Sequence, residues 1–180
     1  MNFLKTDLEG VFVLKFKQLG DDRGWFTRSY CQKEFEEIGF TENWVQHNHS
    51  FTKYKGTVRG MHYQIGAYQE VKLVRCIAGK VLDVVVDLRE NSLTFLKYFS
   101  IELSEEDLSA VFIPKGFAHG FQTLTDDCQL LYCHSEFYNP DAEAGVLYND
   151  PAIGINWPLQ ITELSKRDSN HPVISPNLKK

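Results

Sequence analysis

Short apolar segments, divided by residues that form turns, run through most of the sequence between residues 44 and 138. They recur about every 8–12 residues, which is typical of a β-sandwich or barrel and not of alternating strands and helices. We therefore predict an all-β fold. The predicted strands cover residues 44–50, 56–64, 70–79, 80–90, 96–104, 110–114, 119–125 and 129–138.

The N-terminal region carries a different pattern. Residues 11–17 predict a first strand, and the Gly-Asp-Asp-Arg-Gly run at 20–24 predicts a turn. The aromatic residues that follow this turn indicate a strand that re-enters the core. Residues 32–40 are the best helix candidate, and Gly39 closes that helix.

The C-terminal region, from about residue 139, is rich in turns. One helical turn is expected at residues 163–168. Because no repeat, low-complexity segment or linker divides the chain, we predict that residues 1–180 form a single domain.

Composition narrows the class of protein. The net charge is −5 with both signs interspersed, which argues against a nucleic-acid partner or an anionic membrane surface. No apolar run reaches the roughly 18 residues of a membrane-spanning helix, and acids near the N-terminus argue against a signal peptide. The cysteines form no CxxC pair, so reduced thiols in a cytoplasmic protein are expected. They are Cys31, Cys76, Cys128 and Cys133.

Candidate chemistry first gathers in residues 59–80, where Arg59, His62 and Lys72 occupy predicted strands. Strands usually hold Val, Ile or Thr at such positions. Strict alternation places Arg59 and His62 on opposite faces, so both line one site only if Arg59 lies at the start of the strand or at a bulge. Gly60 leaves room for a close approach of another backbone there.

Three further features point to the same pocket. His119 lies in an apolar turn, IPKGFAHGF, and apolar turns often line a cavity. Tyr132 lies in an apolar strand, where its hydroxyl needs a partner. Asp83 and Asp87 share one face of a Val-rich strand, and an arginine partner for Asp87 is as plausible as a role beside the pocket.

Three chemistries fit a histidine, a lysine and a tyrosine inside a β-barrel. The first is proton transfer beside a carbonyl, with His as base, Lys stabilising the enolate oxygen and Tyr as acid. The second is a metal site with His62 and His119 as ligands. The third is plain binding of an anionic ligand by Arg and Lys.

Motifs spread over about residues 11–168 carry a resemblance to a known family. They are DDRGWF (21–26), VQHNHS (45–50), RGMHYQ (59–64), KLVR (72–75), VDLR (86–89), IPKGFAHGF (113–121), LLY ending at Tyr132, and NDPAIGINWP (149–158). In order and spacing they resemble the dTDP-4-dehydrorhamnose 3,5-epimerases, cupin-type enzymes of nucleotide-deoxysugar synthesis. The resemblance implies a jelly-roll (cupin) barrel with a few short helices, a homodimer, and no metal or other cofactor.

The resemblance also implies a reaction and the residues that perform it. The family epimerises C3, C5 or both in a nucleotide-linked 4-keto-6-deoxyhexose. His62 corresponds to the base, Asp168 of LSKRD supports it, Lys72 lies near the C4 oxygen, and Tyr132 is the acid on the opposite face. These are the residue types that the proton-transfer reading requires.

Substrate binding is expected from a larger set of positions, with Arg23 and Arg59 on the diphosphate. The full set is Arg23, Phe26, Arg28, Gln46, His47, Asn48, Arg59, His119, Tyr138, Glu143 and Arg167. Arg28 and His47 stand where the family has acidic residues, and Arg167 stands where it has lysine. The nucleotide therefore stays open, as does inversion at one or both carbons.

Two alternatives lie outside this reaction. The second cupin motif is present around His119, but the first needs a His-x-His pair and reads His62-Tyr63-Gln64 here, which disfavours a metal-dependent oxygenase. A sugar-binding jelly roll without catalysis would not require Lys72 and Tyr132 together with His62.

Overall fold

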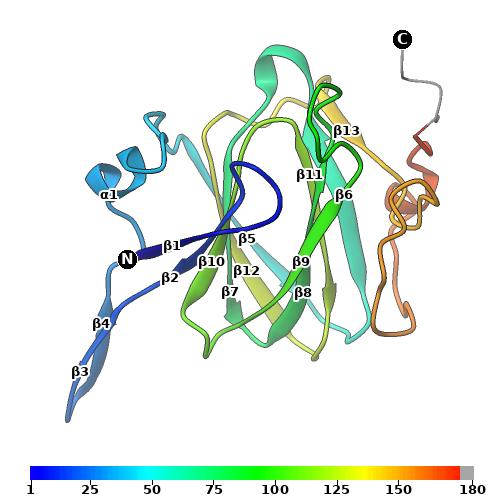
Figure 1. Cartoon of the computed structure of the whole chain (residues 1–180). Coiled ribbons are helices and arrows are strands. Elements are labelled where there is room, and N and C mark those ends of the chain that lie inside the picture. Colours follow the sequence, from blue (N-terminus) through cyan, green and yellow to red (C-terminus); the bar gives the residue numbers. More distant parts are fainter. Residues whose placement is uncertain (175–180) are drawn as a thin grey trace.

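Two antiparallel sheets packed face to face make up most of the computed structural model, which describes residues 1–174 (Figure 1). The six-stranded sheet has the order β1-β2-β10-β7-β12-β5, and the five-stranded sheet has the order β13-β6-β11-β8-β9. This confirms the predicted all-β jelly roll. The last six residues of the expected domain, 175–180, lie outside the described part.

The elements have the following bounds. The first sheet contains β1 (Asn2–Lys5), β2 (Phe12–Lys15), β10 (Ser109–Ile113), β7 (Lys72–Ala78), β12 (Cys128–His134) and β5 (Gln46–Thr52). The second contains β13 (Glu143–Gly145), β6 (Val58–Gln64), β11 (Phe117–Thr123), β8 (Lys80–Asp87) and β9 (Tyr98–Ser104). A separate hairpin pairs β3 (Gln18–Asp21) with β4 (Gly24–Thr27), and the helices are α1 (Gln32–Glu36), η1 (Gly66–Tyr68) and η2 (Asp168–Asn170).

Strand β8 shows how alternation builds two apolar layers. Val81 and Val85 point between the sheets, where they join the core that also holds Val74 and Leu130 from the opposite sheet. Leu82 and Val84, which alternate with them, point to the other face. That face is covered by the C-terminal segment with Val146, Ile153, Ile155 and Trp157. Strand β8 is therefore buried on both sides, which explains its almost unbroken run of valines.

A third apolar cluster lies on the outer face of the six-stranded sheet. Helix α1 places Phe35, which is fully buried, against Phe40 and Phe112. The helix was predicted, and Gly39 follows it with φ +84°, a left-handed conformation that glycine adopts without a steric cost.

The β3–β4 hairpin differs from its prediction. Its aromatic residues were expected to re-enter the core, yet Trp25 and Phe26 are 52% and 69% exposed. The hairpin projects from the body of the molecule on the same side as α1, and we call residues 18–27 the arm (Figure 1). The prediction was wrong because the sequence of a short two-stranded ribbon looks the same whether or not another element covers its apolar side chains.

Smaller differences concern short elements. Strands β1, β3 and β13 were not predicted, since each has only three or four residues. The helical turn expected at 163–168 begins at Asp168, because Leu164 forms a β-bridge with Val58.

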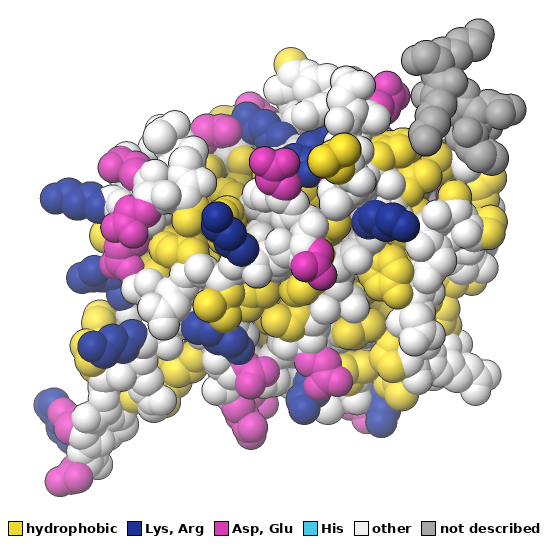
Figure 2. All heavy atoms as spheres, viewed as in Figure 1, with side chains coloured by type: hydrophobic (Ala, Val, Ile, Leu, Met, Phe, Trp, Pro, Cys, Tyr) yellow, Lys and Arg dark blue, Asp and Glu magenta, His cyan; other side chains and the backbone are white. Residues whose placement is uncertain are grey.

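The surface and the thiols agree with the composition. Figure 2 shows Lys, Arg, Asp and Glu side chains interspersed over one face of the molecule. All four cysteines are free, and Cys76 and Cys128 are buried. Within residues 1–174 no helix combines the length and hydropathy needed to cross a bilayer.

Candidate active site

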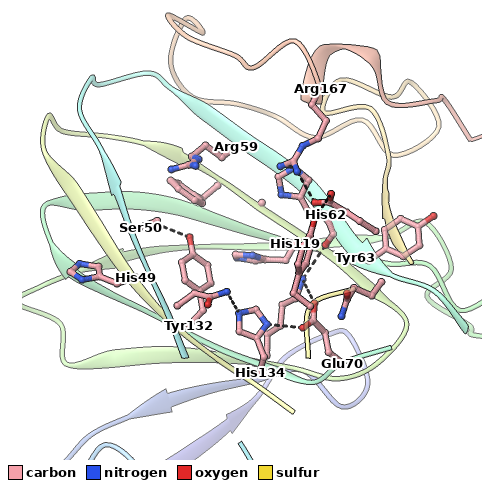
Figure 3. Close-up of a pocket in the computed structure, with 17 residues that line it drawn as sticks. His49, Ser50, Arg59, His62, Tyr63, Glu70, His119, Tyr132, His134 and Arg167 are labelled. Atoms are coloured by element: carbon pink, nitrogen blue, oxygen red, sulfur yellow. Dashed lines mark hydrogen bonds and ion pairs between the residues drawn. The ribbon is translucent and has the colours of Figure 1, made fainter. Parts of the chain in front are cut away.

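A cavity of about 280 Å³ opens between the two sheets, and ionisable side chains line much of it (Figure 3). Strands β5, β7 and β12 of one sheet and β6 and β11 of the other supply most of its walls. Nine of the predicted site residues line it: Asn48, Arg59, His62, Lys72, His119, Tyr132, Tyr138, Glu143 and Arg167.

A bulge in β6 brings Arg59 and His62 to the same cavity. Along β11 the partners of His62 and Arg59 are His119 and Phe121, so three steps on β6 face two steps on β11. Gly60 lies at this irregularity with φ +134°, and a Cβ placed there would lie 2.6 Å from the Cα of Gly120. The bulge that the sequence required for a shared site is therefore present.

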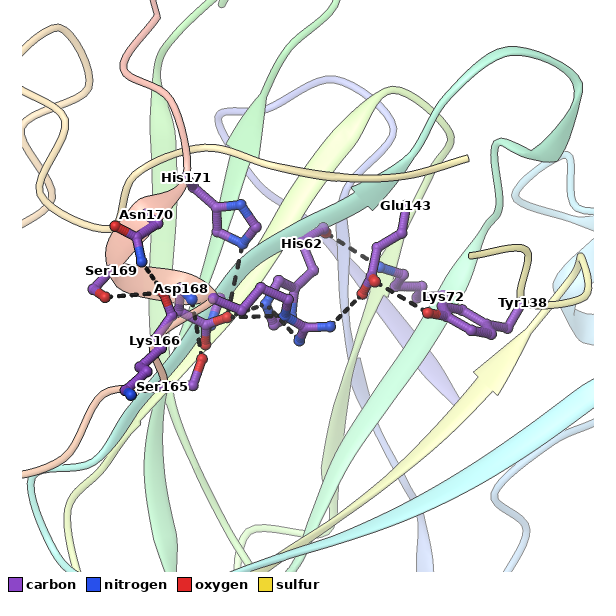
Figure 4. Close-up of polar contacts among 12 residues, drawn as sticks. His62, Lys72, Tyr138, Glu143, Ser165, Lys166, Asp168, Ser169, Asn170 and His171 are labelled. Atoms are coloured by element: carbon purple, nitrogen blue, oxygen red, sulfur yellow. Dashed lines mark hydrogen bonds and ion pairs between the residues drawn. The ribbon is translucent and has the colours of Figure 1, made fainter. Parts of the chain in front are cut away.

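The carboxylate of Asp168 fixes the orientation of the His62 ring. His62 Nε2 lies 2.9 Å from Asp168 Oδ1, and the other carboxylate oxygen accepts the backbone N–H of Gly60 at 3.2 Å (Figure 4). Burial alone raises the pKa of the Asp168 carboxyl, but the hydrogen bond and the charge of His62, together with the Gly60 N–H, hold that pKa well below its ordinary value. The carboxylate stays charged and fixes the proton of His62 on Nε2, which leaves Nδ1 as the basic nitrogen.

Tyr132 faces the cavity from β12, on the sheet opposite His62 (Figure 3). Its hydroxyl lies 3.2 Å from Ser50 Oγ. Burial raises the pKa of Tyr132 to about 12, against the opposing effect of the Ser50 hydrogen bond. The phenol therefore keeps its proton at neutral pH and suits the role of a proton donor.

His119 and Arg167 have fixed partners of their own. His119 Nε2 lies 2.7 Å from Asp83 Oδ2, both groups are buried, and Asp87 pairs instead with Arg89 at 2.8 Å. Asp87 thus has the arginine partner that was one of its two expected roles. At the cavity mouth Arg167 Nη1 lies 2.6 Å from Glu143, which also accepts the hydroxyl of Tyr138.

Eight lining residues were not among the predicted site residues, and two of them, Glu70 and His134, form a polar cluster with Lys72. Glu70 lies 3.2 Å from Lys72 Nζ and 2.7 Å from His134 Nδ1. His134 shares a strand face with Tyr132, two positions earlier, so alternation alone places both side chains in the same cavity. Glu70 lies two positions before Lys72 in the predicted strand 70–79, so the same alternation places it on the face of Lys72, although in the structure it precedes β7.

Five predicted binding residues do not line the cavity of their own chain. Arg23, Phe26 and Arg28 lie on or next to the arm, and the Arg23 side chain is 89% exposed beside Asp21. His47 lines a groove on the outer face of the sheet with Trp44, because alternation along β5 turns it away from its neighbours. Gln46 contacts the cavity indirectly, through Asn48 and the backbone N–H of Tyr138.

One cluster has the donor atoms for a metal ion. His62, Asp168 and His171 offer ligand atoms within 4.8 Å of one another. The Arg167 guanidinium lies 3.2 Å from His62 Nε2 and 3.3 Å from Asp168 Oδ1, so a positive group already contacts two of these atoms. A divalent cation would have to displace that charge, and the donor set does not fit one well.

Comparisons with known proteins agree with this geometry. A sequence profile described as dTDP-4-dehydrorhamnose 3,5-epimerase matches residues 5–175. The chain belongs to the dTDP-4-dehydrorhamnose 3,5-epimerase family. It is 44% identical over 180 residues to the enzyme of that name from Salmonella typhimurium, covering 99% of this chain and 98% of the relative.

Two solved structures of the family share the fold. The crystal structure of the epimerase from Elizabethkingia anophelis superposes with a TM-score of 0.93 at 40% identity and 96% coverage of both chains. An epimerase from Legionella pneumophila, in complex with dTDP-4-keto-L-rhamnose, superposes with a TM-score of 0.90 at 38% identity, covering 96% of this chain and 92% of that one. The family assignment inferred from the motifs is confirmed.

Proposed function

We propose that this protein epimerises C3 and C5 of a dTDP-linked 4-keto-6-deoxyhexose, converting dTDP-4-dehydro-6-deoxy-D-glucose to dTDP-4-dehydro-L-rhamnose. The observation that carries the proposal is that a base, a cation and a proton donor face one cavity from different walls: His62, Lys72 and Tyr132. Relatives of nearly the same length bear the name of this activity.

In the proposed mechanism His62 removes a proton from a carbon next to the C4 ketone. The electrons move to the C4 oxygen, which becomes an enolate, and the Lys72 ammonium stabilises the developing negative charge. Asp168 stabilises the imidazolium that forms, because its carboxylate lies 2.9 Å from the ring. Tyr132 then donates its proton to C5 from the opposite sheet, which inverts that carbon.

The dTDP group is proposed from the relatives and from the cationic side chains near the cavity. A related structure is a complex with dTDP-4-keto-L-rhamnose. Arg59 lines both the cavity and an adjoining groove that also contains Lys53 and Arg167, so positive charge is available for a diphosphate. Binding measurements with dTDP, UDP, CDP and GDP test the nucleotide, and equal affinity for all four would contradict dTDP.

Solvent exchange tests the reaction itself. The protein is incubated in D₂O with the 4-keto-6-deoxy sugar nucleotide, and NMR follows deuterium entering C3 and C5. The parent protein is expected to exchange both carbons. His62→Asn is expected to lose exchange at both while keeping nucleotide affinity, and undiminished exchange in that variant would rule out His62 as the base.

We further propose a homodimer in which the arm of one protomer completes the cavity of its partner. Three arm side chains that carry apolar surface, Leu19, Trp25 and Phe26, are each more than half exposed, which favours contact with another copy. The same arm holds Arg23, an expected diphosphate ligand that lies outside its own cavity.

Mixing two inactive variants tests this arrangement. Arg23→Ala and His62→Asn proteins, each defective alone, are unfolded together and refolded. If the arm serves the partner, half of the sites in mixed dimers are intact, so activity recovers to about one quarter of the parent's. No recovery, or a monomer in sedimentation, contradicts the proposal.

A further inference from the structure

A buried carboxylate that the proposed mechanism does not use, that of Glu70, lies next to Lys72. Glu70 and Lys72 are both about nine-tenths buried at their side chains, and Glu70 Oε1 lies 3.2 Å from Lys72 Nζ. The second oxygen of Glu70 lies 2.7 Å from His134 Nδ1. An uncompensated ammonium is costly at such depth, and so is an uncompensated carboxylate.

The contacts of Lys72 define where its remaining N–H points. An ammonium has three N–H donors. One faces Glu70, and a second faces the backbone carbonyl of His62 at 3.3 Å. Since Lys72 lines the cavity, the third N–H is the one available to an oxygen bound there.

His134 is held as a neutral ring by its two neighbours. Asn48 accepts Gln46 Nε2 at its Oδ1, so its Nδ2 is the atom that faces His134, and it donates to His134 Nε2 at 3.3 Å. His134 Nδ1 is then the protonated nitrogen and donates to Glu70. The ring also stacks on Tyr132, with centroids 6.1 Å apart and planes 23° apart. His134 therefore fixes Glu70 without neutralising it.

We propose that Glu70, clamped by His134, is a positioning residue that keeps Lys72 charged and aims its free N–H at the substrate's C4 oxygen. This inference rests on the proposed epimerase function. Glu70 acts through Lys72 and touches no reacting atom. His134 links that charge pair to Asn48, an expected substrate ligand.

Other ionisable groups around the pair do not replace Glu70. The groups that line the same cavity from neighbouring strands are His49 on β5, Arg59, His62 and Tyr63 on β6, His119 on β11, Tyr132 and His134 on β12, and Glu143 on β13. Of these only Glu143 is an acid, and it bonds Arg167 and Tyr138. Among the described residues, Glu70 is thus the carboxylate that pairs with Lys72.

Glu70→Gln tests the proposal, because the amide keeps the size and removes the charge. We expect kcat to fall about tenfold or more with KM changed less than about threefold. The alkaline limb of the kcat profile is expected to move to lower pH, since an unpaired buried ammonium loses its proton more readily. An unchanged limb with kcat within twofold of the parent would overturn the proposal.

A measurement without substrate separates this inference from the proposed function. NMR of protein labelled at lysine Cε, with the Lys72 signal assigned through Lys72→Arg, follows the titration of the ammonium. In Glu70→Gln that titration should move to lower pH than in the parent, because the opposing charge is gone. If the parent shows no epimerase activity but the titration moves, the function fails and the charge pairing stands; an unmoved titration overturns the pairing itself.

A charge-retaining variant and a control variant complete the test. Glu70→Asp retains the charge and should leave the Lys72 titration near the parent's while lowering kcat, because the shorter carboxylate reaches fewer partners. If Glu70→Gln does not fold, Glu70→Asp still tests the role, since a kcat within twofold of the parent's would contradict it. Glu102→Gln is the matched control, since Glu102 faces Lys80 at 3.8 Å on the exposed side of β9 and should change neither readout.

Discussion

Replacing Asp168 with asparagine tests whether the histidine–carboxylate pair drives proton removal. Three N–H groups converge on this carboxylate: His62 Nε2–H, the backbone N–H of Gly60 and Arg167 Nε–H. An amide has one oxygen and one NH₂, so it cannot accept at both positions. In one orientation its NH₂ faces the Gly60 N–H, which then has no acceptor. In the other its NH₂ donates to His62 Nε2, and the ring proton moves to Nδ1, the nitrogen that should act as base.

The magnitude follows from what each arrangement removes. Loss of the correct tautomer and of the charge beside the imidazolium typically lowers kcat about 10²- to 10⁴-fold. This corresponds to about 3–5 kcal/mol of activation free energy. The donor left without an acceptor lowers the free energy of unfolding by about 1–3 kcal/mol, since Asp168 is 2% exposed and water does not replace the bond.

The assay compares deuterium exchange at C3 and C5 by NMR, with urea unfolding measured in parallel. Asp87→Asn is the control, because Asp87 is also a buried aspartate with several donors but does not line the cavity. It should lose stability and keep exchange. Exchange by Asp168→Asn within about threefold of the parent's would refute the role of the pair.

Three further predictions concern other parts of the site and fold. Tyr132→Phe should lower protonation at C5 by about 10²-fold and keep part of the exchange at C3, and equal loss at both carbons by NMR would mean a structural role. Gly60→Ala should lower the free energy of urea unfolding by about 3 kcal/mol, whereas Gly24→Ala, with nearly the same φ but nothing within 4 Å, should lower it less. Burial raises the pKa of Asp87, but hydrogen bonds from Arg89, Ser92 and Thr94 together lower it to about 2, so Asp87 stabilises the fold above its ordinary pKa of 3.8. Asp87→Asn should therefore cost about 2 kcal/mol at pH 7, and the difference from the parent should shrink as pH falls toward 2.

Alternation made the central strands predictable. Val81, Val84 and Val85 could be assigned to faces from the sequence, and the structure divides them between two apolar layers in that way. Every such strand is at least half covered, so its apolar period carries the fold. Strands β1 and β13 carried no such pattern, because four and three residues are too few to show a period.

The arm shows where periodicity fails. Its sequence has turn chemistry followed by Trp25 and Phe26, which predicts a strand but not what covers it. In the structure both side chains are exposed. A chain that buries apolar residues against another copy looks the same in sequence as one that buries them in its own core, since either partner removes the side chains from water.

The site depends on a bulge in β6. Alternation in the sequence showed only that Arg59 and His62 could share a site if such a bulge existed. Arg59 and His62 share a cavity because β6 contains an extra residue where Gly60 meets Gly120. The two glycines are visible in the sequence, 60 positions apart, but their contact is a property of strand register. Register is set by all pairs in the sheet together and not by local composition.

Three of the four histidines that line the cavity, His62, His119 and His134, illustrate the same limit and also its resolution. Each is paired with its own carboxylate, so residue type and pairing do not distinguish a base from a structural ring. Exposure does: the side chain of His62 is 26% exposed, against 6% for His119 and 10% for His134. A base must reach a proton on a bound sugar, so the most accessible of these three carboxylate-paired rings suits that role and the two buried ones suit fixed positions. This ranking supports the assignment of proton removal to His62, and it is why His134, paired with Glu70, is better understood as holding Lys72 than as a second base.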